Sequence, residues 1–187
     1  MENIIRYTAS VGDILIAANE THIIALRIGD QQKLAPTTYQ NTMVKETKIL
    51  HACCEWLDAY FAGERPDISY LPLAPGGTQF QQTVWQLLRQ IPYGTVVTYG
   101  DVAQEVAKQM GKKRMSAQAI GGAVGHNPIS LIIPCHRVVG ADGSLTGYAG
   151  GLYLKKKLLQ HEGITVDGLC LAEGSLHRIS NNGGMIY

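Results

Sequence analysis

Hydrophobic and polar positions divide the first part of the chain into strands followed by a helix. The apolar runs at residues 14–18 and 23–28 are bounded by turn residues such as Gly12-Asp13 and Asn19-Glu20, and predict two β-strands. Between about residues 44 and 61, apolar side chains recur at helical spacing, and Gly63 followed by Pro66 ends the predicted helix. Its apolar face consists of Ile49, Cys53, Trp56, Leu57, Tyr60 and Phe61.

The second part of the chain is mostly helical. Thr78 caps a predicted helix through about residue 90, whose apolar face is Phe80, Val84, Trp85, Leu87 and Leu88. A further helix is expected over about residues 102–109, and after the polar loop 111–114 Ser116 caps a short helix over residues 117–125. Two short helices joined by a turn have the outline of a helix-turn-helix, although many proteins that do not bind DNA contain such pairs.

The short helix at residues 117–125 is made almost entirely of small side chains. They are Ala117, Ala119, Gly121, Gly122, Ala123 and Gly125. Each glycine costs a helix about 1 kcal/mol relative to alanine, so this composition needs a reason. Two reasons stay open: close approach to DNA, or tight packing against another helix.

Composition and charge indicate a globular chain with an uneven charge distribution. The 187 residues are 45% hydrophobic with a net charge of +1. A linker at Pro75-Gly76-Gly77 predicts domains at 1–75 and 76–187. Residues 1–75 carry 6 Lys/Arg and 9 Asp/Glu, a net charge of −3, and residues 76–187 carry 10 and 6, a net charge of +4. The second part is therefore the one suited to a polyanion.

The cysteines indicate a reducing compartment. Cys53, Cys54, Cys135 and Cys170 are too few for a secreted disulfide framework and lack the paired spacing of a zinc site. No apolar run approaches the ~18–20 residues of a membrane span. We expect a cytoplasmic protein with no bound metal and no membrane partner.

The strongest chemical signal is Pro134-Cys135-His136-Arg137, which follows a predicted buried strand at residues 131–133. A free thiol of pKa ~8.5 is only slightly ionised at neutral pH, and a neighbouring imidazole or cation lowers that pKa. Adjacent strand residues point to opposite faces, so the side chains of Cys135 and His136 cannot pair directly in a regular strand. They interact only if the backbone turns after Pro134 or a water connects them. Glu162, at the end of a further helix, is placed to orient His136 in a Cys–His–carboxylate relay. The alternative is an inert buried thiol and a solvated Glu162.

Six motifs together resemble the O6-alkylguanine-DNA alkyltransferase family over about residues 78–165. They are Thr98-Tyr99-Gly100, Ala119-Ile120-Gly121-Gly122-Ala123, Asn127-Pro128, Ile133-Pro134-Cys135-His136-Arg137-Val138, Thr146-Gly147-Tyr148-Ala149-Gly150-Gly151 and His161-Glu162-Gly163. The resemblance implies an α/β N-terminal domain with a ribonuclease-H-like sheet and a mainly α C-terminal domain with a helix-turn-helix.

The same resemblance implies DNA repair by direct reversal. The expected partner is double-stranded DNA containing O6-alkylguanine, with O4-alkylthymine as a second candidate substrate. After base flipping, the alkyl group passes irreversibly to the protein's own Cys135, once per molecule and without a cofactor. The protein is expected to act as a monomer.

Carried over position by position, the resemblance also assigns site residues. Cys135 is the alkyl acceptor, His136 its water-linked base and Glu162 the carboxylate that orients the base, while Asn127 holds the turn before the active site. The expected base pocket contains Tyr99, Val124, Val138, Tyr148 and Ala149, with Tyr99 donating to the guanine and the amide of Ala149 facing O6. The carbonyls of Cys135 and Val138 would accept from the exocyclic amine. The expected DNA contacts are Lys112, Lys113, Arg114, Ser116, Gln118, Ala119, Gly121, Gly122 and Arg137.

The sequence also departs from the family pattern. Gln118 stands where the family usually has the arginine that fills the gap left by the flipped base, and the preceding loop is longer and more basic. The N-terminal zinc ligands of some relatives are missing, and the tail after Ile164 follows no pattern. Two other functions stay open. A non-enzymatic protein that binds alkylated DNA would lack the acceptor Cys135, and a Cys–His hydrolase or acyltransferase leaves the small-residue helix unexplained.

Overall fold

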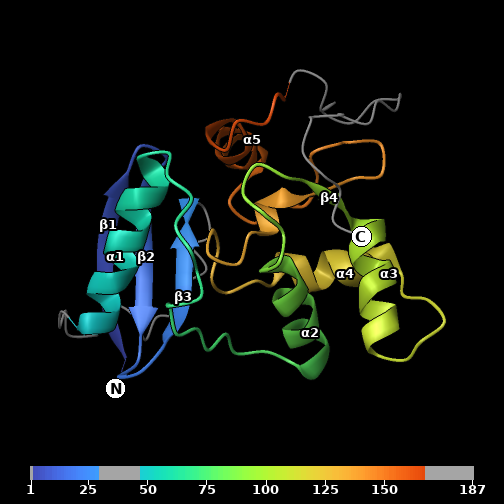
Figure 1. Ribbon diagram of the computed structural model, residues 1–187, viewed down its shortest axis with the longest axis horizontal. Coiled ribbons are helices and arrows are strands. Elements are labelled where there is room, and N and C mark those ends of the chain that lie inside the picture. Colours follow the sequence, from blue (N-terminus) through green and yellow to red (C-terminus); the bar gives the residue numbers. More distant parts are fainter. Residues whose placement is uncertain (1, 30–46, 167–187) are drawn as a thin grey trace. The chain divides into compact units, whose positions relative to one another are not determined.

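The computed structural model describes residues 2–29 and 47–166, which form two compact units (Figure 1). The first unit holds the described residues up to Gly76 together with 128–132, and the second holds residues 77–127 and 133–166. Segment 128–132, which the sequence assigns to the second domain, thus belongs to the first unit. Every helix among the described residues is too short or too polar to span a lipid bilayer.

The first unit is a three-stranded antiparallel sheet with one helix packed on it. Strands β1 (Asn3–Ala9), β2 (Gly12–Ala18) and β3 (Ile23–Ile28) lie in the order β1-β2-β3, and α1 (Lys48–Phe61) contacts all three, crossing in front of β1 and β2 in Figure 1. The two strands predicted from the sequence are β2 and β3. The sequence does not predict β1, an edge strand whose Arg6 and Thr8 are exposed.

Helix α1 begins at a threonine cap and buries one face. The Thr47 hydroxyl accepts from the amide of Leu50. The buried residues are Leu50, Cys53, Trp56, Leu57 and Tyr60. Ile49 and Phe61, which are also predicted on the apolar face, are half-buried, and Leu50 is buried although it is not predicted. Cys53 is fully buried and is a core residue, as predicted, and this burial raises the pKa of its thiol. Residues 44–46 of the predicted helix, and Cys170, lie outside the described residues.

Residues 128–130 pair with the edge of this sheet. The amide of Leu26 donates to the carbonyl of Pro128 at 2.9 Å, and the amide of Ser130 donates to the carbonyl of Leu26 at 3.0 Å. The predicted strand at residues 131–133 is wrong. The pairing ends at Ser130 and the chain turns, with Leu131 in the left-handed region at φ 69°. An apolar run in a buried turn has the same sequence pattern as a buried strand.

The second unit packs three short helices together: α2 (Gln79–Leu88), α3 (Tyr99–Gln109) and α4 (Ala117–Gly125). Thr78, Thr98 and Ser116 each cap a helix with a side-chain oxygen. Helix α3 begins at Tyr99 rather than at about residue 102, because Thr98 and Asp101 form a capping box. The indole of Trp85 donates to the carbonyl of Ala123 at 2.9 Å and ties α2 to α4.

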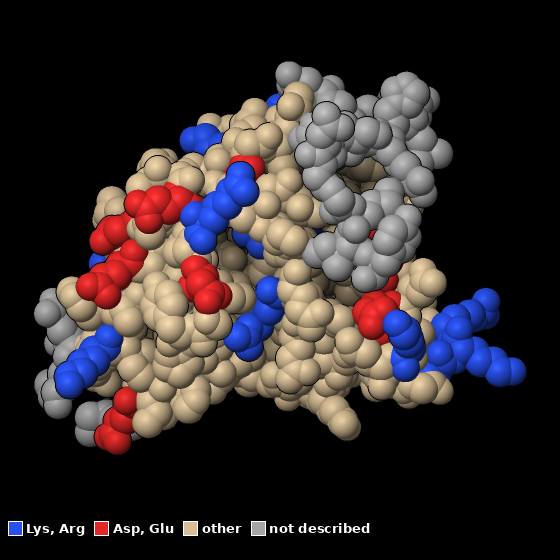
Figure 2. Space-filling model, viewed as in Figure 1, with Lys and Arg blue, Asp and Glu red and all other residues tan. Residues whose placement is uncertain are grey.

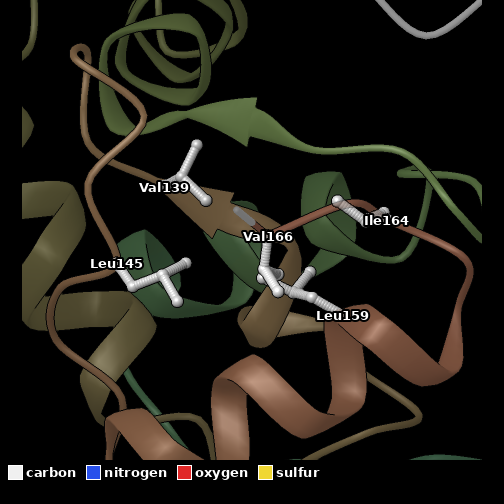
Figure 3. Close-up of a cluster of buried hydrophobic side chains, with 5 residues drawn as sticks. All are labelled: Val139, Leu145, Leu159, Ile164 and Val166. Atoms are coloured by element: carbon white, nitrogen blue, oxygen red, sulfur yellow. The ribbon is translucent and has the colours of Figure 1, made fainter. Parts of the chain in front are cut away.

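The rest of this unit contains the cysteine motif and the last helix. A single 3-10 turn, η3 (Cys135–Arg137), leads into β5 (Val138–Val139), which pairs in parallel with β4 (Val97–Thr98); α5 spans Leu152–His161. Figure 3 shows a cluster of Val139, Leu145, Leu159, Ile164 and Val166. Leu159 and Ile164 flank Glu162 in the chain, so this cluster fixes the end of α5 against β5 and holds Glu162 in place.

Candidate active site

Cys135 begins a 3-10 turn and is buried, at 3% exposure. Its amide donates to the carbonyl of Ile133 at 2.8 Å, so the backbone turns at Pro134. Asn127, just after α4, donates through Nδ2 to Cys135 Sγ at 3.1 Å and to the carbonyl of Ile133 at 2.8 Å. An N–H aimed at sulfur stabilises the thiolate more than the thiol. Asn127 therefore holds the turn and also contacts the thiol.

His136 and Glu162 form a buried pair beside the cysteine. His136 Nε2 lies 2.7 Å from Glu162 Oε1, and both side chains are fully buried. Burial lowers the pKa of the His136 imidazole, with smaller contributions from Arg137 and Lys155, against the raising effect of Glu162. A carboxylate only accepts, so Nε2 carries the proton of the neutral ring. The lone pair then lies on Nδ1, which is buried and has no hydrogen-bond partner among the described residues.

Arg137 completes a buried charged cluster with the same carboxylate. Its Nε donates to Glu162 Oε2 at 2.8 Å and its Nη2 to Oε1 at 3.0 Å, while Nη1 donates to the carbonyl of Ile91 at 2.6 Å. Burial opposes the charge of Glu162, but His136 and then Arg137 outweigh it and hold the pKa of the carboxyl well below its usual range. The amide of Gly94 adds a hydrogen bond to Oε2 at 3.1 Å.

The prediction that Arg137 contacts DNA is therefore corrected. The residue is 8% exposed, and all three guanidinium nitrogens donate inside the protein. The sequence places Arg137 next to the cysteine but carries no sign that its partner is Glu162, at the end of another helix. Its role in the structure is to neutralise and orient that carboxylate.

The Lys155 ammonium group and the Thr146 carbonyl connect Tyr99, Val138 and the loop after Ser144 by hydrogen bonds. The Tyr99 hydroxyl donates to the carbonyl of Thr146 at 3.2 Å. Lys155 Nζ donates to the same carbonyl at 2.8 Å and to that of Val138 at 2.5 Å. Burial raises the pKa of Tyr99, so its phenol stays protonated. Gly147 has φ +59°, and a Cβ there would lie 3.1 Å from the Tyr99 hydroxyl, so this approach requires glycine.

The other predicted pocket residues lie at different depths. Val124 is buried on α4 and Val138 is buried on β5, and Tyr148 is 8% exposed. Ala149 is exposed. Hydrogen bonds from Tyr99 and Lys155 thus connect Thr146 with Val138.

Helix α4 presents a face of small residues to solvent. Ala117, Gln118, Gly122 and Gly125 are exposed, and Ala119 and Gly121 are half-buried. A Cβ built at Gly122 or Gly125 meets nothing within 4 Å, and one at Gly121 reaches only Tyr99 at 3.9 Å, an ordinary contact. Packing within the described residues therefore does not explain these glycines.

Basic side chains gather next to this face. Lys112, Lys113 and Arg114 are exposed in the loop between α3 and the Ser116 cap. Together with Lys108 they line a shallow groove between α3 and the start of α4. Figure 2 shows a group of basic side chains at the outer end of this loop, at the right edge of the view.

Comparison with known families covers both units. The family described as 6-O-methylguanine DNA methyltransferase, DNA binding domain, matches residues 79–164, and its ribonuclease-like domain matches residues 6–75. A methylated-DNA–protein-cysteine methyltransferase of Methanosarcina acetivorans is 40% identical over 159 residues, which cover 84% of this chain and 96% of that protein. The chain belongs to the methylated-DNA–protein-cysteine methyltransferase family.

Other members of this methyltransferase family agree in sequence and fold. The Haemophilus influenzae protein of that name is 40% identical over 158 residues, covering 84% of each chain. The crystal structure of Mycobacterium tuberculosis O6-methylguanine methyltransferase has a TM-score of 0.73 at 37% identity, covering 87% of this chain and 93% of that chain. The structure of Mycobacterium tuberculosis OGT in complex with DNA has a TM-score of 0.69 at 37% identity, covering 86% and 91%.

The buried position of Lys155, beside the residues of this methyltransferase-family motif, is not predicted from the sequence. Three consecutive lysines, Lys155–Lys157, are typical of a solvated helix face. The buried residues of α5, however, are Leu154, Lys155, Leu158 and Leu159, which recur at helical spacing. The position of Lys155 among the apolar residues of its helix is the sequence signal that could have indicated its burial.

Proposed function

We propose that this chain is a methylated-DNA–protein-cysteine methyltransferase that repairs O6-alkylguanine in double-stranded DNA by direct reversal. The Cys135 thiolate attacks the alkyl carbon, a sulfur–carbon bond forms, and the bond from that carbon to O6 breaks. The electron pair of the broken bond stays on O6, and the guanine takes up one proton at N1 from solvent. The resulting thioether is stable, so each molecule reacts once and needs no cofactor. O4-alkylthymine is a second candidate substrate.

The observation that carries this proposal is the arrangement of donors and bases around Cys135. The Asn127 amide lies 3.1 Å from Sγ, and the neutral His136 ring has its free lone pair on buried Nδ1. We assign Nδ1 to take the thiol proton through one water, with Glu162 bound to the opposite nitrogen of the ring. The positive charge that then develops on the His136 imidazole is stabilised by the Glu162 carboxylate, which is already bound to that ring.

The base pocket is assigned to Tyr99, Val124, Val138, Tyr148 and Ala149. Extrahelical placement of the lesion is required because a thiol cannot reach O6 inside a stacked duplex. The protonated Tyr99 phenol donates to the Thr146 carbonyl in this structure and is assigned to turn its one O–H to the displaced guanine. The carbonyls of Cys135 and Val138 are assigned as acceptors for the guanine amine. Ala149 is exposed, and its amide is assigned to O6.

DNA binding is assigned to a helix-turn-helix formed by α3, the basic loop and α4, within a C-terminal domain of residues 76–187. The exposed small face of α4, with Ser116, Ala119, Gly121 and Gly122, admits a close approach to the minor groove. Gln118 is assigned to the gap left by the flipped base, and Lys112, Lys113 and Arg114 to the phosphates. Residues 1–75 are assigned to the N-terminal domain, and segment 128–132 belongs to the same compact unit.

Intact-mass spectrometry tests the function. The full chain is incubated with a duplex containing one O6-methylguanine, and a gain of one methylene, mapped to the peptide with Cys135, is expected. Cys54→Ser, a half-buried thiol in the first unit, is the matched control and should gain the same mass. Tight lesion binding without a mass gain would instead indicate a non-enzymatic lesion-binding protein. Catalytic ester turnover without methyl gain would indicate a hydrolase.

A further inference from the structure

A lysine is completely buried next to the reactive cysteine motif. Lys155, on the buried face of α5, has 0% exposure. Removing an ammonium group from water costs several kcal/mol unless polar partners replace the water. Here Nζ donates to the backbone carbonyls of Val138 and Thr146. A purely structural position on an apolar helix face would be filled more favourably by leucine or methionine, so the charge needs a reason.

The two carbonyls belong to different parts of the proposed base pocket. Val138 directly follows η3, the turn that begins with Cys135. Thr146 begins the loop that carries Tyr148 and Ala149, and its carbonyl also accepts from the Tyr99 hydroxyl. The ammonium group lies 5.9 Å from the centroid of the Tyr99 ring. One buried cation thus contacts β5, the 146–149 loop and the first residue of α3.

We propose that Lys155 is a positioning residue for alkyl transfer: its ammonium group holds Val138, Thr146 and Tyr99 in one arrangement around the base and places a positive charge near the Cys135 sulfur. The proposal rests on the proposed function, because it names the pocket of that same reaction. Lys155 contacts the Val138 and Thr146 carbonyls and takes no part in proton transfer.

The charge of Lys155 is set by the groups that face it. Burial lowers the pKa of Lys155 to about 8, against the raising effect of Cys135. The other titratable groups are His136 on η3, whose pKa Lys155 lowers, and Tyr99 on α3. Lys155 is therefore mostly charged near neutral pH. An adjacent positive charge favours the thiolate over the thiol.

The variant Lys155→Met tests this role, because methionine retains most of the aliphatic stem and removes the charge and the donors. Lys157→Met is the matched control on the same helix: Lys157 is exposed, and its ammonium lies over the Tyr153 ring. Transfer from an O6-methylguanine duplex is expected to slow about tenfold or more in Lys155→Met and to be unchanged in Lys157→Met. Circular dichroism and thermal melting establish that each variant folds.

A second readout needs no DNA. Alkylation of Cys135 by iodoacetamide, followed by peptide mass across a pH series, should shift to higher pH in Lys155→Met and stay in place in Lys157→Met. A residue that only fills space would not move this profile. If Lys155→Met is unstable, Lys155→Arg, which keeps the charge and the donors, should retain the wild-type iodoacetamide profile, while Lys155→Gln should shift it.

The outcomes separate the two proposals. If the wild type gains no methyl group from the duplex, the proposed function fails, and the iodoacetamide profiles still report on the influence of Lys155 on the thiol. If the wild type is methylated but Lys155→Met reacts at the same rate with the same pH profile, the positioning role is overturned. Equal slowing in Lys155→Met and Lys157→Met would also overturn it.

Discussion

Arg137 and Glu162 form a bidentate ion pair in the interior of the second unit, with Nε 2.8 Å from Oε2 and Nη2 3.0 Å from Oε1. The carboxylate is shared, since Oε1 also accepts from His136. His136 and then Arg137 therefore keep Glu162 ionised against the effect of burial, while burial keeps His136 neutral. This division of charge leaves a neutral base, with a defined tautomer, beside the thiol.

Removing Arg137 is expected to affect stability rather than DNA contacts. Arg137→Met leaves the Glu162 carboxylate buried without its cation, which costs about 3–5 kcal/mol of unfolding free energy. The slope of log DNA affinity against log salt should not change, because Arg137 does not face solvent. Urea unfolding and binding at several salt concentrations measure the two effects. Lys112→Met is the reverse control: little loss of stability, and a slope smaller by about one.

The nucleophile is separable from DNA binding. Cys135→Ser is expected to abolish methyl transfer and to leave duplex affinity nearly intact, because the thiol is buried and the assigned phosphate contacts lie in the loop at residues 112–114. Mass spectrometry and fluorescence anisotropy on the same lesion duplex measure both. Transfer by the serine variant at a rate close to that of the wild type would reassign the nucleophile.

The relay predicts a characteristic pH dependence. His136→Ala and Glu162→Gln should slow transfer and move the rate profile to higher pH, because both weaken the base that takes the thiol proton. Glu162→Gln should also destabilise the fold, since Arg137 then lacks its anion. Single-turnover rates from pH 5 to 9 measure the profiles. Unchanged profiles in both variants would leave Asn127 and Lys155 as the groups that activate the thiol.

Burial of neutral His136 also makes stability depend on pH. Its folded pKa is lowered, so below the unfolded value of about 6.5 the unfolded chain binds more protons than the folded one. Stability should therefore fall as the pH falls below about 6.5. Urea midpoints at pH 5, 6 and 7 measure this loss, which should be smaller in His136→Asn. An equal loss in that variant would assign the acid sensitivity to other groups.

The parts of the fold with local signals are predictable from the sequence. Thr78 and Ser116 lie before apolar periodicity and cap α2 and α4, as predicted, because a helix start needs an acceptor for its free amides. The turn at residues 131–133 is not predictable in this way. It directly follows residues 128–130, which pair with β3 about a hundred residues earlier in the chain, and its own residues are buried, so they lack the alternation that distinguishes strands from turns.

The candidate site also contains residues that the sequence predicts and residues that it does not. Cys135 and His136 are adjacent in sequence, and their residue types predict the chemistry. The buried positions of Arg137 and Lys155 are not predicted, because charged side chains are mostly exposed unless paired. Their partners are distant in sequence: Glu162 lies 25 residues from Arg137, and the carbonyl of Val138 lies 17 residues from Lys155. Only the fold brings these groups together.

The glycines of α4 provide a prediction in which stability and function change in opposite directions. Gly122→Ala should raise the unfolding free energy by up to about 1 kcal/mol, because alanine is the better helix former and its Cβ meets nothing within 4 Å. Gly122→Leu should also fold but bind duplex DNA more weakly, since its side chain occupies the surface assigned to the groove. Thermal melting and anisotropy measure both. Wild-type affinity in Gly122→Leu would remove α4 from the DNA interface.

Gln118 and Arg114 provide the last prediction. Both are exposed, but Gln118 lies in the first turn of α4 whereas Arg114 lies in the loop before the Ser116 cap, out of helical register with Gln118. A neutral amide in the gap left by a flipped base can hydrogen-bond to the orphaned cytosine but lacks the charge of an arginine. We therefore expect Arg114, with Lys112 and Lys113, to supply the electrostatic part of binding. Repair of a duplex lesion at two salt concentrations should be slower and less salt-dependent in Arg114→Ala, and faster at high salt in Gln118→Arg. If Arg114→Ala changes neither the rate nor the salt dependence, the loop has no compensating role and Gln118 acts alone.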